Sequence, residues 1–215
     1  MQPPDRDALV AGAAELGVTL DESQATRLLD YLALLTKWNR VYNLTAVRQP
    51  ADMLVQHLLD CIAIIAPLCR WADGHPQRLL DVGSGAGLPG VVVATLLPAF
   101  DVTCVDAVGK KVAFVRQAGG ELGLYNLHAT HGRVEALATG LFDVVASRAF
   151  ASLRDFTALT RPHMGPGSVW LAMKASAPDD ELAELPQDID VFHVEQLAVP
   201  GLDAKRCLVW MRLRS

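Results

Sequence analysis

Apolar residues in the first third of the chain recur at helical spacing. Between residues 21 and 38, leucines stand three or four positions apart and therefore share one face of a helix. Asp21 or Ser23 caps this helix, because either side chain accepts a hydrogen bond from a free backbone amide of the first turn. A second helix is predicted over about residues 51–71, with Pro50 in its first turn.

The pattern changes after the turn-forming sequence Asp73-Gly74-His75-Pro76. Short apolar runs now alternate with helical stretches, which predicts a mostly parallel sheet covered by helices on both faces. The seven predicted strands are residues 78–82, 102–105, 127–130, 142–146, 168–173, 190–197 and 207–213. Helices are predicted near residues 88–97, 110–122, 153–163 and 179–185.

No helix is predicted between the last two strands, so we expect them to pair antiparallel at the sheet edge across the loop 199–206. A length of 215 residues suits one domain, or one domain with a small appendage. We therefore predict an α/β fold in which a helical extension, residues 1–72, and a sheet-containing core, residues 73–215, form one compact unit.

Composition restricts the class of protein. Hydrophobic residues make up 51% of the chain and charged residues 20%, so a sizeable core is expected. We see no signal peptide, and the longest apolar runs, residues 61–69 and 91–97, are too short to span a bilayer, which predicts a cytoplasmic protein. The four cysteines are scattered and lie near no histidine at metal spacing, so no metal site is expected.

The strongest chemical signal is a glycine loop between the first core strand and the next helix. It reads Asp81-Val82-Gly83-Ser84-Gly85-Ala86-Gly87-Leu88. A loop in this position presents backbone N–H groups to a ligand, and its glycines let the backbone approach closely. A dinucleotide-binding fold needs its third glycine where Leu88 stands. The spacing of Asp81, Gly83, Gly85 and Gly87 resembles the first motif of class I S-adenosylmethionine-dependent methyltransferases, which binds the amino-acid end of the cofactor.

Asp106 follows the second core strand, 25 residues after Asp81. A carboxylate at the tip of that strand accepts hydrogen bonds from both ribose hydroxyls of an adenosine cofactor. Because NAD enzymes use the same arrangement, Asp106 indicates an adenosine ligand without choosing between the two cofactors. The loop spacing makes that choice in favour of S-adenosylmethionine.

The residues after the fourth core strand restrict the class of molecule that can accept the methyl group. Methylation of an exocyclic adenine amine typically uses an Asn/Asp-Pro-Pro-aromatic loop, whereas Ser147-Arg148-Ala149-Phe150 contains no proline. Methylation of a pyrimidine carbon requires a nucleophilic cysteine, and no cysteine lies in a loop after a predicted strand of the cofactor half. Guanine N7 has a free lone pair and no proton, so positioning alone is enough. This argument permits N7 chemistry and many other transfers.

Four segments in combination resemble the RsmG family, formerly called glucose-inhibited division protein B. They are Trp38-Asn39-Arg40-Val41-Tyr42-Asn43-Leu44-Thr45, His57-Leu58-Leu59-Asp60, Gly87-Leu88-Pro89-Gly90 and Ser147-Arg148-Ala149-Phe150-Ala151-Ser152-Leu153. The resemblance covers the chain from about Leu28 to its end. It implies methyl transfer from S-adenosylmethionine to N7 of guanine 527 in the 530 loop of bacterial 16S rRNA, with S-adenosylhomocysteine as the other product. We expect a monomer that acts on the small ribosomal subunit.

Carried over position by position, the resemblance implies cofactor contacts at Gly83, Leu88, Val134, Glu135 and Arg148. The turn Gly132-Arg133-Val134-Glu135 matches the family's turn after the third strand, where the resemblance implies that adenine is held.

The acceptor-pocket candidates are Asn39, Asn43 and Arg148. Arg148 stands at the carboxyl edge of the predicted sheet, where a fixed cation binds the cofactor's carboxylate or an RNA phosphate. Its charge makes it a poor partner for a guanine N7 that becomes cationic, so we assign Arg148 to binding.

Two further pairs have structural interpretations. His57 lies three residues before Asp60 on a helix, which predicts a contact between their side chains. Trp38 and Tyr42 are four residues apart, and we expect both rings in the core rather than in a base-stacking platform.

The net charge of −5 argues against a uniformly basic surface for RNA, although a local patch is sufficient. Several basic residues follow predicted strands, on the side expected for the cofactor, and acids cluster elsewhere. We therefore predict a basic face around the methyl-donor pocket. Its members are Lys37, Arg40, Arg48, Lys110, Lys111, Arg116, Arg133, Arg148, Arg154, Arg161, Lys174, Lys205 and Arg206.

Two other functions stay open at this point. A methyltransferase of the same fold that acts on a small molecule or a protein would use the helical extension as a lid over a closed apolar pocket. A regulatory module that binds S-adenosylmethionine or a nucleotide without catalysis would have an occluded acceptor position.

Overall fold

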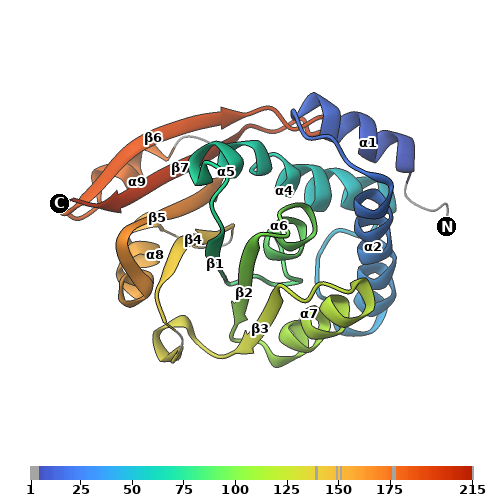
Figure 1. Ribbon diagram of the computed structural model, residues 1–215, viewed down its shortest axis with the longest axis horizontal. Coiled ribbons are helices and arrows are strands. Elements are labelled where there is room, and N and C mark those ends of the chain that lie inside the picture. The colour runs from blue at the N-terminus through green and yellow to red at the C-terminus, as the bar shows by residue number, and fades with distance from the viewer. Residues whose placement is uncertain (1–4, 139, 149, 151, 176–177, 215) are drawn as a thin grey trace.

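The computed structural model describes residues 5–138, 140–148, 150, 152–175 and 178–214. Its centre is a seven-stranded sheet with the order β3-β2-β1-β4-β5-β7-β6 (Figure 1). The strands are β1 (Gln77–Val82), β2 (Phe100–Asp106), β3 (Leu127–His131), β4 (Phe142–Ser147), β5 (Met164–Lys174), β6 (Ile189–Leu197) and β7 (Arg206–Leu213). Strands β1 to β5 pair in parallel, and β7 is antiparallel to both β5 and β6. The predicted mostly parallel sheet and its antiparallel edge are confirmed.

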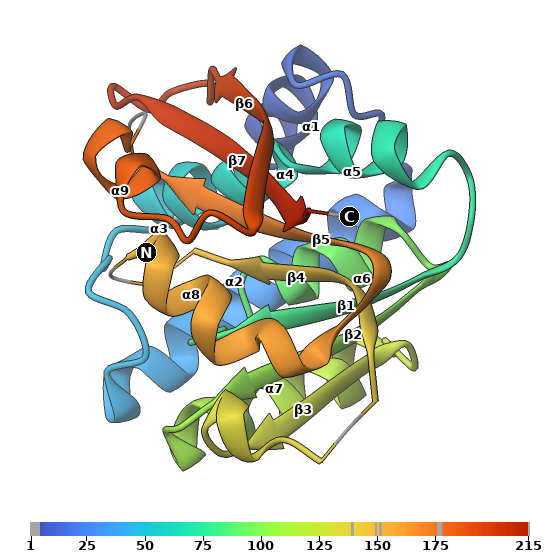
Figure 2. The ribbon, with the colours of Figure 1, turned by 90° about the vertical axis from the view of Figure 1, so that its left-hand side faces the viewer.

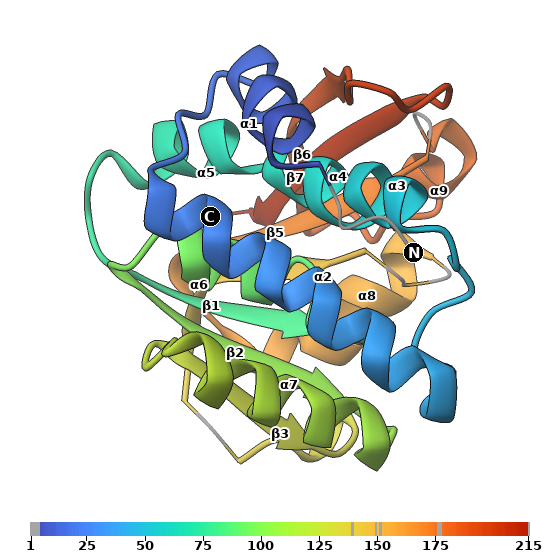
Figure 3. The same ribbon diagram turned by 90° about the vertical axis from the view of Figure 1, so that its right-hand side faces the viewer.

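Helices cover both faces of the sheet. The helical segments are α1 (Arg6–Glu15), α2 (Glu22–Tyr42), α3 (Pro50–Met53), η1 (Leu54–Leu59), α4 (Asp60–Ile62), α5 (Ile65–Ala72), α6 (Gly90–Leu96), α7 (Gly109–Leu122), η2 (Val134–Ala136), α8 (Leu153–Thr160), η3 (Arg161–His163) and α9 (Asp179–Ala183). Figure 2 shows α8 and α9 on one side, and Figure 3 shows α2, α6 and α7 on the other.

Alternate residues of the central strands face two separate hydrophobic clusters. Leu79 and Val144 pack in the cluster that contains residues of the helical extension, α6 and α7. Their neighbours Leu80 and Val145 pack in the cluster that contains α8. Because β1 and β4 are buried on both faces, they read in the sequence as continuous apolar runs without alternation.

Helix α1 was not predicted, and its composition explains why. Its buried residues are Leu9, Gly12 and Ala13, of which two are too small to mark an apolar face. A Cβ at Gly12 would lie only 2.7 Å from Leu59 Cδ1, so α1 packs closely against η1, and a larger residue at position 12 would require the Leu59 side chain to move.

Helix α2 begins at a capping box. The Asp21 carboxylate accepts from the Gln24 amide at 2.7 Å, and the Gln24 side chain accepts from the Asp21 amide at 3.0 Å. Of the two predicted caps, the structure therefore uses Asp21 rather than Ser23.

The second predicted helix is a succession of α3, η1, α4 and α5 over Pro50–Ala72. A window of this stretch reaches a mean hydropathy of 1.6, enough by length and composition to cross a membrane, yet 72% of it is buried inside the protein. The stretch contains no long uninterrupted apolar run, because polar residues such as His57 and Asp60 interrupt it. Both side chains are buried in the protein.

The prediction that both Trp38 and Tyr42 lie in the core is correct for Trp38 only. Trp38 packs against the first cluster, with its ring 5.5 Å from that of Phe114. Tyr42 is 43% exposed, so its placement in the core was wrong. Tyr42 is the last residue of α2, and its ring packs against that of Trp38 of the same helix, 5.0 Å away.

Tyr31 connects the helical extension to the glycine loop. Its hydroxyl donates to the Ala86 carbonyl at 2.8 Å, and the bond is buried. Burial raises the pKa of Tyr31 well above its usual range, so the phenol remains a donor.

Tyr31→Phe should lower the free energy of unfolding by about 1–2 kcal/mol, because a buried carbonyl loses its donor. Urea denaturation measures this loss. Tyr125→Phe is the matched control, since Tyr125 is 94% exposed and the change should leave stability unaltered. Equal stability of the Tyr31 variant and the parent would contradict the coupling.

Candidate active site

The glycine loop leaves β1 at the carboxyl edge of the sheet, beside the point where the strand order reverses between β1 and β4. Gly83, Gly85 and Gly87 have positive φ angles of 67°, 60° and 85°. A Cβ at Gly83 or Gly85 would meet nothing within 4 Å, whereas one at Gly87 would lie 2.8 Å from Val91 Cγ2. The first two glycines therefore face open space, and the third allows close packing against α6.

Five amides of the glycine loop are bonded within the protein, contrary to the expectation that they face a ligand. Gly83 and Ser84 donate to the Val105 carbonyl, and Gly85 donates to the Asp106 carboxylate at 2.9 Å. The amides of Gly87 and Leu88 donate to the Ser84 carbonyl. A pyrophosphate cradle needs free amides, and these five are satisfied within the protein. For these five amides the expected donation to a ligand is wrong, and their bonding within the protein disfavours a dinucleotide.

A cavity of about 260 Å³ opens over Gly83, near the lower end of the volumes of small-molecule sites. It brings together four predicted cofactor residues, Gly83, Asp106, Val134 and Glu135. The other lining residues were not predicted as cofactor contacts; they are Val82, Val105, Ala107, Gly132, Arg133, Phe150 and Leu159. Phe150 and Arg133 stand in motifs that were recognised, whereas Leu159 carries no signal of its own. Apolar walls with two carboxylates fit an adenosine, whose ring is flat and whose ribose presents hydroxyl donors.

Asp106 lines this cavity and also forms a hydrogen bond to the glycine loop. One oxygen accepts from the Gly85 amide, the other accepts from the Val108 amide at 2.8 Å, and Lys111 Nζ lies 3.8 Å away. Each carboxylate oxygen keeps a further lone pair. Contact with the ribose hydroxyls therefore stays a prediction that this geometry allows.

Asp81 and Leu88 are buried and line neither this cavity nor the second cavity below. Asp81 Oδ2 accepts from the Gly90 amide at 2.8 Å, which anchors the start of α6. Oδ1 has no hydrogen-bond partner among the described residues. Burial raises the pKa of Asp81 to about 7, against the opposing effects of the Gly90 hydrogen bond and of Arg148. Asp81 therefore supports the loop, and its direct contact with the cofactor stays a prediction.

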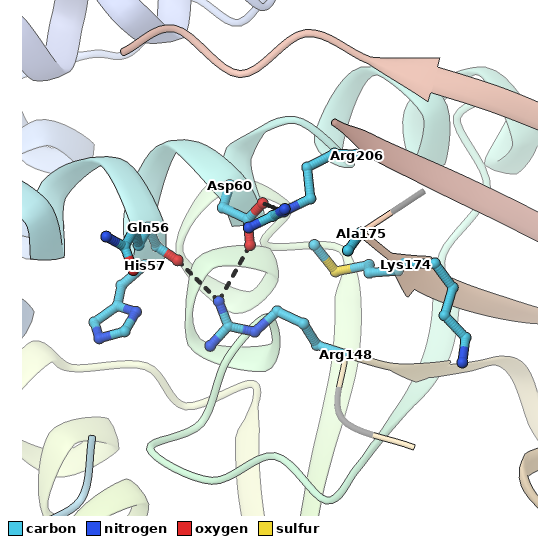
Figure 4. Close-up of a pocket in the computed structure, with 8 residues that line it drawn as sticks. Gln56, His57, Asp60, Arg148, Lys174, Ala175 and Arg206 are labelled. Atoms are coloured by element: carbon cyan, nitrogen blue, oxygen red, sulfur yellow. Dashed lines mark hydrogen bonds and ion pairs between the residues drawn. The ribbon is translucent and has the colours of Figure 1, made fainter. Parts of the chain in front are cut away.

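A second cavity of about 300 Å³ lies over the ends of β4 and β5, beneath η1 and α4 (Figure 4). Arg148 reaches into it from the end of β4 and donates to the Gln56 carbonyl at 3.0 Å. The other lining residues are His57, Asp60, Met173, Lys174, Ala175 and Arg206. Ala149 and Ala151, from the same motif as Arg148, lie outside the described residues.

Asp60 holds two arginines of this cavity. Its side chain is 5% exposed and forms ion pairs with Arg148 at 3.3 Å and with Arg206 at 2.8 Å. One carboxylate neutralises only one of the two guanidinium groups, so the cluster keeps a net positive charge. Both arginines line the cavity, with 28% and 23% of their side-chain surfaces exposed.

The predicted contact between His57 and Asp60 is wrong. His57 Nε2 lies 3.0 Å from Thr45 Oγ1, and Nδ1 has no partner among the described residues. Asp60 instead turns to the arginines, because two cations outweigh one imidazole as partners for a buried carboxylate. Burial and the charge of Arg148 lower the pKa of His57 to about 4, so its ring is neutral at pH 7.

Asn39 and Asn43 shape the turn after α2. Asn39 Oδ1 accepts from the Thr45 amide at 2.9 Å, and its Nδ2 donates to the Val47 carbonyl at 3.3 Å. Asn43 adopts a left-handed conformation, and its side chain accepts from Arg48 at 2.8 Å. Neither lines the two cavities described, so their role in the acceptor pocket stays a prediction.

Solved methyltransferase structures have the same fold. TrmN from Thermus thermophilus matches with a TM-score of 0.58 at 18% identity, over 75% of this chain and 53% of that chain. The glycopeptide N-methyltransferase MtfA, solved with S-adenosylmethionine, also matches with a TM-score of 0.58, at 15% identity, over 69% of this chain and 92% of that chain. The sheet order and the glycine loop define a class I S-adenosylmethionine-dependent methyltransferase fold.

Comparison with known sequences identifies the family, whereas the structural comparison shows only the fold. The family model described as rRNA small subunit methyltransferase G matches residues 24–209. Ribosomal RNA small subunit methyltransferase G of Leptothrix cholodnii is 60% identical over 212 residues, covering 99% of this chain and 97% of that protein. Its counterpart in Acidovorax sp. (strain JS42) is 59% identical over 213 residues, covering 95% and 94%. The chain belongs to the rRNA small subunit methyltransferase G family, whose cofactor is S-adenosylmethionine.

Asp60→Asn should lower the free energy of unfolding by about 3 kcal/mol, because two partly buried arginines lose their counter-charge. Asp190→Asn is the control, since Asp190 pairs with the 55%-exposed Arg212, and exposed pairs contribute less than about 1 kcal/mol. Chemical denaturation compares the two variants. Similar losses would show that Asp60 contributes no more than a surface ion pair.

Asp81 should make stability depend on pH. Its pKa in the folded protein, about 7, lies above its ordinary value of 3.8. Between these values the unfolded chain releases the proton and the folded chain keeps it, so the stability from this group falls as pH rises. The free energy of unfolding of the parent minus that of Asp81→Asn should therefore decrease across this range. A difference that is constant with pH would exclude a raised pKa at Asp81.

Proposed function

We propose that this protein transfers a methyl group from S-adenosylmethionine to N7 of guanine 527 in the 530 loop of bacterial 16S rRNA. The observation that carries the proposal is the adjacency of two cavities at the carboxyl edge. One has the glycine loop and carboxylates that suit an adenosine, and the other has two arginines. Family membership supports rRNA as the acceptor, and the resemblance of the four motifs supports the atom and the nucleotide.

The residues of the first cavity suit the cofactor. S-adenosylmethionine, when bound, supplies a sulfonium methyl group that is open to nucleophilic attack. Gly83 and Gly85 allow close approach at the loop, while Asp106 and Glu135 present acceptors for hydroxyl or amine donors. Arg148 offers a cation to the cofactor's carboxylate or to an RNA phosphate.

Guanine N7 carries a lone pair and no proton, so the transfer needs positioning rather than a general base or a metal. Methylation makes the base cationic. In the second cavity, His57 is neutral at pH 7 and therefore does not repel a cationic base. Asp60 offsets part of the charge of the two arginines.

The charged lining of the second cavity disfavours the closed apolar pocket expected for a small-molecule acceptor. We further propose that the enzyme works as a monomer in the cytoplasm and that the small ribosomal subunit presents the target loop.

The deciding experiment uses tritiated S-adenosylmethionine and small subunits from a strain that lacks the endogenous enzyme. We expect 7-methylguanosine at position 527 of 16S rRNA. Gly83→Asp places a side chain in the open space over the loop and should lower the rate by about 100-fold or more.

Gly123→Asp is the matched control. Gly123 has a similar φ of 64° and open space around a Cβ, but it caps the far end of α7. Equal losses in both variants would indicate backbone strain alone. Label in another nucleotide, or none in rRNA, would overturn the proposed function.

A further inference from the structure

Exposed apolar side chains gather where α2 ends, next to the first turn of α7. Val41 is 70% exposed, Tyr42 is 43% exposed, and Val108, just before α7, is 38% exposed. Helices α2 and α7 lie side by side in Figures 1 and 3, and the Trp38–Phe114 ring contact joins them. We call Trp38, Val41 and Tyr42, with Arg40 and Lys110, the α2 platform.

The Tyr42 ring of the platform packs against further aromatic rings. The ring of Tyr42 lies 5.0 Å from that of Trp38, which itself packs edge-on against Phe114 at 5.5 Å. A ring backed by a second ring keeps its orientation while much of its surface stays in contact with solvent. This arrangement suits stacking of a flat ligand, because little conformational entropy is lost on binding.

The charged residues in the two chain segments that contain the platform are all basic. Residues 37–48 and 107–116 contain six basic residues and no acid, in a chain whose net charge is −5. Arg40 and Lys110 are exposed. Of the others, Arg48 bonds to Asn43, and Lys111 lies near Asp106. An apolar patch alone fits many protein partners, but an exposed aromatic residue in segments that carry basic residues and no acid favours a single-stranded nucleic acid.

The platform borders the proposed site. Val108 stands two residues after Asp106, which lines the first cavity, and α7 begins at Gly109. The end of α2 also approaches the second cavity, because Thr45, three residues after Tyr42, lies 3.0 Å from His57, which lines that cavity.

We propose that the α2 platform binds the single-stranded RNA that flanks the target guanine. Tyr42 stacks on one base, and Arg40 and Lys110 contact neighbouring phosphates. The inference rests on the proposed function, because it takes the acceptor to be RNA.

The test measures equilibrium binding to unmethylated small subunits for the parent, Tyr42→Leu and Tyr42→Phe. Leucine keeps apolar contact with Trp38 but cannot stack, so we expect affinity to fall about 5- to 100-fold. Phenylalanine keeps the ring and should bind as the parent does. Unfolding free energy and S-adenosylmethionine affinity should be unchanged in both variants.

Tyr125→Leu is the matched control. Tyr125 is 94% exposed but precedes β3, at the opposite edge of the sheet from the site, so binding should not change. In addition, Arg40→Ala or Lys110→Ala should each reduce the slope of log affinity against log salt by about 0.7, as expected for one lost phosphate contact.

If Tyr42→Leu binds small subunits as tightly as the parent does, the proposed RNA binding by the α2 platform is wrong. The proposed function is not affected by that result. A loss with subunits but not with protein-free 16S rRNA would overturn the proposed RNA binding as well, because the partner would then be a ribosomal protein. If the parent enzyme labels no rRNA, the proposed function fails, and parent-like RNA binding by Tyr42→Leu would still decide against the platform.

Discussion

The shape of the glycine loop depends on three hydrogen bonds made by side chains, two of them buried and one partly buried. Asp106 binds the Gly85 amide, Asp81 binds the Gly90 amide, and Tyr31 binds the Ala86 carbonyl. Each contact satisfies a polar group that burial would otherwise penalise by about 1–3 kcal/mol. The loop can therefore stay open over Gly83 without amides directed at a ligand. Its conformation is determined by β2, α6 and α2 together.

Asp60 has a similar role for the second cavity. It lies in the helical extension but forms ion pairs with Arg148 after β4 and Arg206 at the start of β7. Paired in this way, the two guanidinium groups tolerate partial burial at the carboxyl edge. The helical extension thus contributes directly to both parts of the site, through Tyr31 at the loop and Asp60 at the arginines.

The strands and the loop were predictable because their signals are local. Buried parallel strands give continuous apolar runs, and DxGxGxG places glycines where positive φ is needed. Helix α1 was not predictable, because Gly12 and Ala13 make its buried face through close approach to Leu59. The His57–Asp60 pairing failed for a related reason: helical spacing places two residues on one face but says nothing of the arginines brought from β4 and β7.

The sequence by itself determined the sheet, the class of cofactor and the family, since these follow from periodicity and from motifs of neighbouring residues. Only the tertiary structure decided which polar groups face one another. It showed that five of the loop amides are already bonded, that Asp81 is a buried support with a raised pKa, and that Tyr42 is exposed rather than in the core. The physical reason is that hydrogen bonding, burial and ion pairing depend on residues that are distant in the chain, and no local pattern records them.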